Sequence, residues 1–159
     1  YYKAFWADPP SCSVGEPRNN YLGEQHLPLI LQNLHRYFLY FALLFLCFLT
    51  YDAIQGFFFD DDGDEKFNDF GIGVGSLVLC MNVFLLGGYT TGCHSLRHLV
   101  GGGSDTTSPS PMRSKCYDCV SCLNGQHMIW AWFSLVWVAF TDVYVRLCSM
   151  GIWHDYRIY

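Results

Sequence analysis

The sequence predicts an all-α integral membrane bundle of three transmembrane helices, with a polar N-terminal arm and a Cys-rich loop. Composition is the first reason: 52% of the 159 residues are apolar and only 14% are charged, whereas a typical soluble domain carries ~25% charged residues. The second reason is that apolar residues gather into three long runs, at 37–59, 70–92 and 128–150. An α-helix of about 20 residues crosses about 30 Å of hydrocarbon, so each run is long enough to span a bilayer.

The ends of the runs carry the aromatic side chains expected at a membrane surface. Trp, Tyr and Phe are typical of the interfacial belts of membrane proteins. Here they are Tyr37, Tyr40, Phe57, Phe58, Phe59, Trp130, Trp132 and Trp153. Their positions support the interpretation of the runs as membrane spans.

The second run begins with three glycines at alternate positions, Gly71, Gly73 and Gly75. They include a small-xxx-small pair, a spacing that permits two helices to approach closely within a membrane. The other interpretation is that glycine is simply common in membrane helices. Both interpretations place these glycines inside the second span.

The chain divides into a short arm and an anchor domain. Residues 1–33 are polar and rich in proline, which predicts an extended arm. Residues 34–159 form the predicted anchor, in which 93–127 make a loop rich in Cys and His. Because the chain starts at Tyr1 and shows no signal-peptide pattern, we expect the natural polypeptide to begin earlier.

Basic residues predict the orientation in the membrane, because Lys and Arg are enriched on the cytoplasmic side. They accompany the arm and the segment after the second span, at Lys3, Arg18, Arg36, Arg97, Arg113 and Lys115. The acidic connection at 60–69 supplies much of the net charge of −5. We therefore expect the arm and the Cys loop to be cytoplasmic and the 60–69 loop to lie outside. No basic face predicts nucleic-acid binding.

The Cys loop contains residues with metal-ligand spacing. His94 and His98 are four residues apart, on one face of a helix, and Cys93 precedes them. Three more thiols follow at three-residue intervals, Cys116, Cys119 and Cys122. Zinc would accept four such ligands, and a [2Fe–2S] cluster would accept two Cys and two His in the Rieske manner. Alternatively, these are reduced thiols and surface histidines that bind no metal.

The ligand spacing limits which group could be held. A Rieske domain carries Cys-x-His followed by Cys-x2-His, and this sequence has neither, so a cluster of this type would have variant ligands. All six histidines lie outside the apolar runs or at their ends. This placement disfavours a haem held at membrane depth by paired histidines.

The third run contains two charged residues, Asp142 and Arg146, four positions apart. An ionisable residue at membrane depth costs ~2.5–3.5 kcal/mol on insertion scales, so it is normally paired. The pair is either a structural tie between helices or a functional group, such as a proton path or an anchor for a quinone head group. His127 and Trp130 lie at the start of the same run. His127 could serve as a metal ligand, a quinone hydrogen-bond donor or an interfacial residue.

Three segments carry a family resemblance. The most specific is Gly92-Cys93-His94-Ser95-Leu96-Arg97-His98-Leu99-Val100-Gly101-Gly102. The others are Leu123-Asn124 with His127-Met128-x-Trp130-Ala131-Trp132, and Thr141-Asp142-x-Tyr144-Val145-Arg146-Leu147. With these segments the chain resembles the membrane-anchor (SdhC-like) subunit of actinobacterial-type succinate dehydrogenases, over roughly residues 33–158.

The resemblance implies a multi-pass anchor in the bacterial inner membrane that docks a flavoprotein and an iron–sulfur subunit on the cytoplasmic face. Electrons from succinate would then pass to menaquinone. It also implies a Rieske-like [2Fe–2S] cluster, with ligands drawn from Cys93, His94, His98, Cys116, Cys119 and Cys122. The candidate quinone-binding residues are Arg97, His127, Trp130, Asp142 and Arg146. A homo-oligomer of the whole complex is compatible with this assignment.

A rival interpretation is a zinc-stabilised membrane protein whose Cys loop binds a partner without electron transfer. In either case the chain has no flavin-binding or dicarboxylate-binding pattern. We therefore expect an anchor subunit of an oxidoreductase that is not catalytic by itself.

Overall fold

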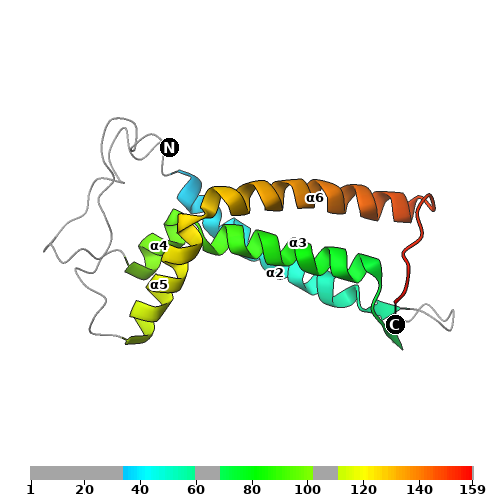
Figure 1. Cartoon of the computed structure of the whole chain (residues 1–159), viewed down its shortest axis with the longest axis horizontal. Helices are drawn as coiled ribbons and strands as arrows, with labels where there is room; N and C mark the ends of the chain where they lie inside the picture. Colours follow the sequence, from blue (N-terminus) through cyan, green and yellow to red (C-terminus); the bar gives the residue numbers. More distant parts are fainter. Residues whose placement is uncertain (1–33, 60–68, 102–110, 159) are drawn as a thin grey trace, which may run out of the picture. The chain divides into compact units, whose positions relative to one another are not determined.

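The computed structural model describes residues 34–59, 69–101 and 111–158. The predicted N-terminal arm and most of the acidic 60–69 loop lie outside the described residues. The elements in chain order are α2 (His35–Gln55), β1 (Phe58–Phe59), β2 (Asp69–Phe70), α3 (Val74–Thr91), α4 (His94–Gly101), α5 (Pro111–Gly125) and α6 (His127–Ser149) (Figure 1). The chain forms two units. One comprises Tyr1–Ala42 and Thr90–His127, and the other comprises Leu43–Tyr89 and Met128–Tyr159.

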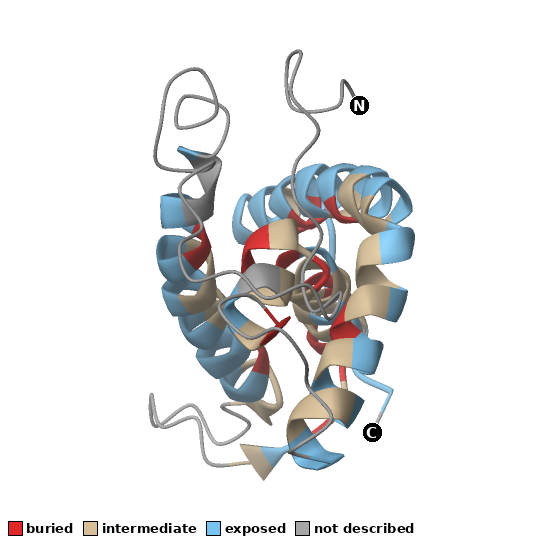
Figure 2. Ribbon diagram, turned by 90° about the vertical axis from the view of Figure 1, so that its left-hand side faces the viewer, coloured by how far each residue is buried: buried red, intermediate tan, exposed pale blue. Residues whose placement is uncertain are grey.

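The predicted fold class is confirmed, because α2, α3 and α6 are long and apolar enough to cross a membrane. Only 11%, 22% and 17% of their most apolar windows is buried, and most of each long helix is coloured as exposed or intermediate in Figure 2. Outward-facing apolar side chains are what a lipid environment requires. The three spans therefore expose apolar surface that lipid or other protein can cover.

Two span boundaries differ from the prediction: the first helix ends before 59, and the second begins at Val74 rather than at 70. The first helix ends at Gln55, because Phe58–Phe59 pairs antiparallel with Asp69–Phe70 in a short ribbon. The Phe57 and Phe70 rings stack at 5.9 Å beside this ribbon. Of the aromatic residues expected at the span ends, Phe58 and Phe59 thus lie in this ribbon and Phe57 lies beside it, after the end of α2.

The residues after α6 turn back toward the start of α3. Gly151 has a φ of 71°, the left-handed conformation that glycine adopts readily at the end of a helix. The backbone N–H of Val74 then donates to the Tyr156 carbonyl at 2.9 Å, and that of Ile158 donates to the Ile72 carbonyl at 2.6 Å. This C-terminal tail, residues 150–158, is therefore fixed by backbone hydrogen bonds to the segment that enters α3.

The side chain of Asp155 lies at the first turn of α3. Its Oδ1 accepts a hydrogen bond from the Gly75 N–H at 2.7 Å and another from the Tyr144 hydroxyl at 2.8 Å. A Cβ at Gly75 would lie 2.6 Å from the Asp155 carboxylate, and one at Gly73 would lie 3.1 Å from it. These glycines make room for a carboxylate at a helix N-terminus, where anions are favoured, rather than for the close helix approach that their spacing predicts.

The helices α3 and α6 are joined by two tryptophans. The indole N–H of Trp137 donates to the Val78 carbonyl at 3.1 Å. Trp130 lies directly on Gly88, where a Cβ would be 2.5 Å from the ring, and meets Phe84 edge to face at 5.8 Å. Because glycine has no side chain, the large indole can pack on the helix backbone itself.

Candidate functional site

The predicted Cys and His loop is helical in its described part, and it forms a pair of helices within one unit. Arg97 of α4 donates from Nε to the Ser121 hydroxyl of α5 at 3.1 Å, and its guanidinium lies 5.2 Å from the centre of the Tyr117 ring. A cation above an aromatic face is attracted by the ring quadrupole. Arg97 is thus held in place by α5 through a hydrogen bond and a ring contact.

Two further hydrogen bonds tie α5 to the neighbouring segments. Arg113 donates from Nε to the Val100 carbonyl at 2.6 Å, close to the end of α4. Asn124 donates from Nδ2 to the Gly92 carbonyl at 2.9 Å, at the residues that join α3 to α4. Both bonds satisfy carbonyls at or beside helix ends, where the backbone lacks partners within the helix.

The three cysteines of α5 do not share this face. Residues 113, 117, 121 and 124 recur at helical spacing on the side that contacts α4, and Val120 on that side is buried. Since 3.6 residues make one turn, Cys116, Cys119 and Cys122 fall on the remaining surface of α5. All three thiols are exposed.

The predicted ligand set of Cys93, His94, His98, Cys116, Cys119 and Cys122 stays a prediction. Within the described ranges, no group of three or more His, Cys, Asp or Glu side chains is arranged to hold a metal ion. Cys93 is half-buried at the start of α4, and the side chain of His98 lies outside the described residues. Sequence analysis placed His94 and His98 on a helix but Cys116, Cys119 and Cys122 in a loop, whereas the structure places all three cysteines on α5.

We expect the single substitutions Cys116→Ser, Cys119→Ser and Cys122→Ser to change stability by no more than about 0.5 kcal/mol each, because exposed side chains contribute little. Thermal unfolding of the purified complex measures this effect. Iron, acid-labile sulfide and zinc are assayed on the same samples. A large loss of stability together with loss of bound metal would instead show that these thiols are ligands.

The candidate quinone-binding residues are spread over two places. His127 is the first residue of α6 and Trp130 lies one turn later, whereas Asp142 and Arg146 lie toward its other end. Sixteen positions separate Trp130 from Arg146, which is about 24 Å along a helix that rises 1.5 Å per residue. The five candidates, with Arg97 on α4, therefore cannot all contact one quinone head group.

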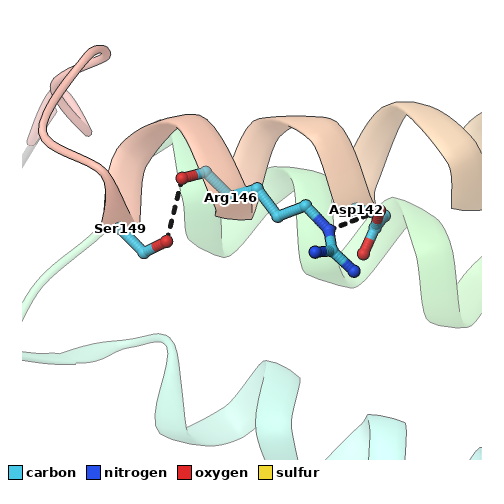
Figure 3. Close-up of polar contacts among 3 residues, drawn as sticks. All are labelled: Asp142, Arg146 and Ser149. Carbon is cyan, nitrogen blue, oxygen red and sulfur yellow. Dashed lines mark hydrogen bonds and ion pairs between the residues drawn. The ribbon is translucent and has the colours of Figure 1, made fainter.

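Asp142 and Arg146 form the ion pair that their spacing predicts. Arg146 Nε donates to Asp142 Oδ2 at 2.8 Å, and Ser149 Oγ donates to the Arg146 carbonyl at 2.8 Å (Figure 3). The side chains of Arg146 and Asp142 remain 72% and 58% exposed. The pair lies on the outer surface of α6 and ties no two described helices together.

The comparisons with known proteins now identify the family. Residues 1–151 match the family model described as actinobacterial succinate dehydrogenase subunit SdhC. The chain belongs to this family. It is also similar to a chain of the Mycobacterium smegmatis Sdh1 complex in the apo form, with 42% identity and a TM-score of 0.73. That alignment covers 100% of this chain and 57% of the relative, and no curated protein matches.

Sequence analysis missed Asp155 and gave no role to Tyr144 of this SdhC-type chain. Tyr144 is 8% exposed, and its hydroxyl donates a hydrogen bond to Asp155. Asp155 also caps α3 at Gly75, which lies 80 residues earlier in the chain. The available signal was the pair of glycines at the start of a helix, since glycine marks places where other groups approach the backbone closely. Nothing in the local pattern indicates that the approaching group is Asp155.

Proposed function

We propose that this SdhC-type subunit anchors the flavoprotein and iron–sulfur subunits of its succinate dehydrogenase complex and helps to form the site at which menaquinone is reduced. Family membership over residues 1–151 is the observation that supports the proposal. The three candidate spans supply the anchor. The polar pair α4 and α5 supplies a surface for the other subunits, on the face that we propose to be cytoplasmic.

Arg97 is the residue that we assign to the quinone head group. Reducing a quinone to a quinol adds two electrons and two protons, and negative charge develops on the carbonyl oxygens before they are protonated. A fixed cationic donor stabilises such charge because it needs no reorganisation during the reaction. Arg97 has this character, since Ser121 and Tyr117 hold its guanidinium in place.

His127 is the second part of this proposal. Asn124, three residues before His127, bonds the Gly92 carbonyl and so fixes the end of α5 close to the start of α4. The chain thus enters α6 at His127 from a segment tied to α4. Asp142 and Arg146 lie too far along α6 to serve the same head group, and we leave them out of the quinone site.

Arg97→Ala should lower succinate-dependent reduction of a menaquinone analogue by roughly a hundredfold or more, the scale for removing one charge-stabilising donor. The assay uses the purified complex, and succinate oxidation by a soluble dye acceptor should remain unchanged. Arg113→Ala is the matched control, because Arg113 also donates from Nε across the α4–α5 contact. Equal losses of quinone reduction in both variants would show that Arg97 contributes only to the packing of α4 against α5.

A [2Fe–2S] cluster in this subunit stays a prediction. The described part of α4 and α5 does not present a set of ligands that fits it, and we derive no electron-transfer step through such a group. The zinc-stabilised alternative gains no support from the described residues for the same reason.

A further inference from the structure

The buried side of α6 is polar. Its buried residues are Ser134, Thr141 and Tyr144, and all three carry a hydroxyl. Each hydroxyl donates a hydrogen bond to another protein group. Because hydrocarbon offers no hydrogen bonds, polar groups inside a span need partners from the protein or from ordered water. The hydroxyl donors of α6 meet this requirement within the protein.

Asn82 on α3 does not meet it. It is the ninth of the 18 residues of α3, so it lies at hydrocarbon depth when this helix spans the membrane. Its side chain is buried, with 5% of the residue exposed. Within the part of the chain that the structure describes, its Oδ1 accepts no hydrogen bond. A buried amide oxygen without a donor is costly, so a partner for it is expected.

The two tryptophans that join α3 to α6 fix the register of the two helices, which run side by side (Figure 1). Trp137 donates to the Val78 carbonyl, and Trp130 lies on Gly88. Ten residues of α3 and seven of α6 separate these two contacts. The helices are therefore antiparallel, and positions between the contacts can be matched across the seam.

This register places Asn82 level with Ser134. Ser134 is 3% exposed and lies between the two tryptophans along α6. Its Oγ donates to the Ala131 carbonyl at 3.0 Å, which leaves the oxygen lone pairs available as acceptors. Serine is much smaller than either indole, so the seam has room between the two rings.

We propose that a water molecule is bound between Asn82 and Ser134, inside the α3–α6 seam, and donates hydrogen bonds to Asn82 Oδ1 and Ser134 Oγ. Buried waters in proteins characteristically bind polar groups that are otherwise unsatisfied. Because both residues are at least nine-tenths buried, neither lipid nor another subunit reaches them. The ligand is therefore small enough to lie within the seam. The proposal does not depend on the quinone role of Arg97.

The chemistry of the two side chains restricts the ligand further. Both are neutral, and an uncompensated cation at this depth would be costly, so the ligand is neutral as well. Rotating the Asn82 amide would present N–H donors in place of Oδ1, and these would need an acceptor. Water both donates and accepts, so it satisfies either orientation.

Cryo-electron microscopy of the purified complex in lipid nanodiscs tests the site without any substitution. At a resolution that shows other ordered waters, we expect a separate density peak at hydrogen-bonding distance from both Asn82 Oδ1 and Ser134 Oγ. A map that shows buried waters elsewhere but no peak here, or a protein or lipid atom packed against Oδ1, would overturn the proposal.

Radiolytic labelling gives an independent test, since hydroxyl radicals formed from an internal water label the side chains beside it. Trp137 is one turn from Ser134, whereas Trp132 is 63% exposed and serves as the internal reference. Asn82→Leu should lower the ratio of Trp137 to Trp132 labelling several-fold. Met81→Leu, a neighbouring change on the same helix, should leave the wild-type ratio. An unchanged ratio in Asn82→Leu would contradict a water held by the amide.

Discussion

Replacing Gly88 by alanine is expected to destabilise the subunit by about 1–3 kcal/mol, the usual range for forcing extra atoms into a packed contact. The new Cβ would lie 2.5 Å from the Trp130 ring, with two further ring atoms within 2.8 Å. These atoms belong to a bulky indole rather than to the end of a flexible chain. The ring has to move away from α3, and it then gives up its contact with Phe84.

Gly87→Ala provides the matched control in the neighbouring position. A Cβ at Gly87 would come no closer than 4.0 Å to Leu46, which is ordinary contact. Alanine also favours helix by about 1 kcal/mol relative to glycine, so this variant should be neutral or slightly stabilised. The difference in thermal midpoint between the two variants, measured in detergent, isolates the clash with Trp130.

A double-mutant cycle then assigns the effect to the tryptophan. Gly88→Ala should cost much less when Trp130 is already replaced by leucine, because the coupling between two contacting residues disappears with either partner. If the cost of Gly88→Ala were the same in both backgrounds, the indole contact would not be its cause.

The second large effect is expected from Asp155→Ala, at roughly 2–4 kcal/mol of lost stability. Loss of a helix N-terminal cap accounts for ~0.5–2 kcal/mol, and loss of a part-buried hydrogen bond to a charged acceptor accounts for ~1.5–3 kcal/mol. Both losses arise from one oxygen, because Oδ1 accepts from Gly75 and from Tyr144 at the same time. Hydrogen exchange at the Gly75 amide should accelerate together with the fall in thermal midpoint.

Two further variants separate the cap from the tyrosine. Asp155→Asn keeps a side-chain oxygen in place and should lose clearly less stability than Asp155→Ala. Tyr144→Phe should destabilise the wild-type protein but have little additional effect once Asp155 is alanine. Additive losses from Tyr144→Phe and Asp155→Ala would show that the hydroxyl is not coupled to this carboxylate.

The three spans could be predicted from sequence because length and apolar composition are sufficient in a bilayer. Lipid places no demand on which face of a helix is apolar, so a long apolar run needs no further pattern to be recognised. The ion pair at Asp142 and Arg146 was equally accessible, because four-residue spacing on a helix brings two side chains together without any tertiary contact.

The helix α5 escaped prediction for a physical reason. Its contact surface with the neighbouring segments consists of Arg113, Tyr117, Ser121 and Asn124, with Val120 as its single buried residue. These side chains act through hydrogen bonds and a ring contact, so no apolar periodicity marks the face. A polar segment with three cysteines therefore suggested a ligand-bearing loop.

The prediction for the glycines at the start of α3 was wrong for a different reason. Their spacing was visible, but the group that occupies the space beside them comes from the tail, 80 positions later. Sequence patterns of short range cannot contain such a pairing. The candidate quinone-binding residues show the same limit, because candidates near both ends of α6 can be separated into two places only once the length of the helix between them is known.

The position of Asp155 also sets an order on biogenesis. The start of α3 leaves the ribosome long before residue 155, yet its first turn receives its cap only from the tail that follows α6. That tail reaches the correct side of the membrane only after α6 has crossed it. During synthesis the N-terminal end of α3 therefore lacks this cap until α6 and the residues that follow it have been made.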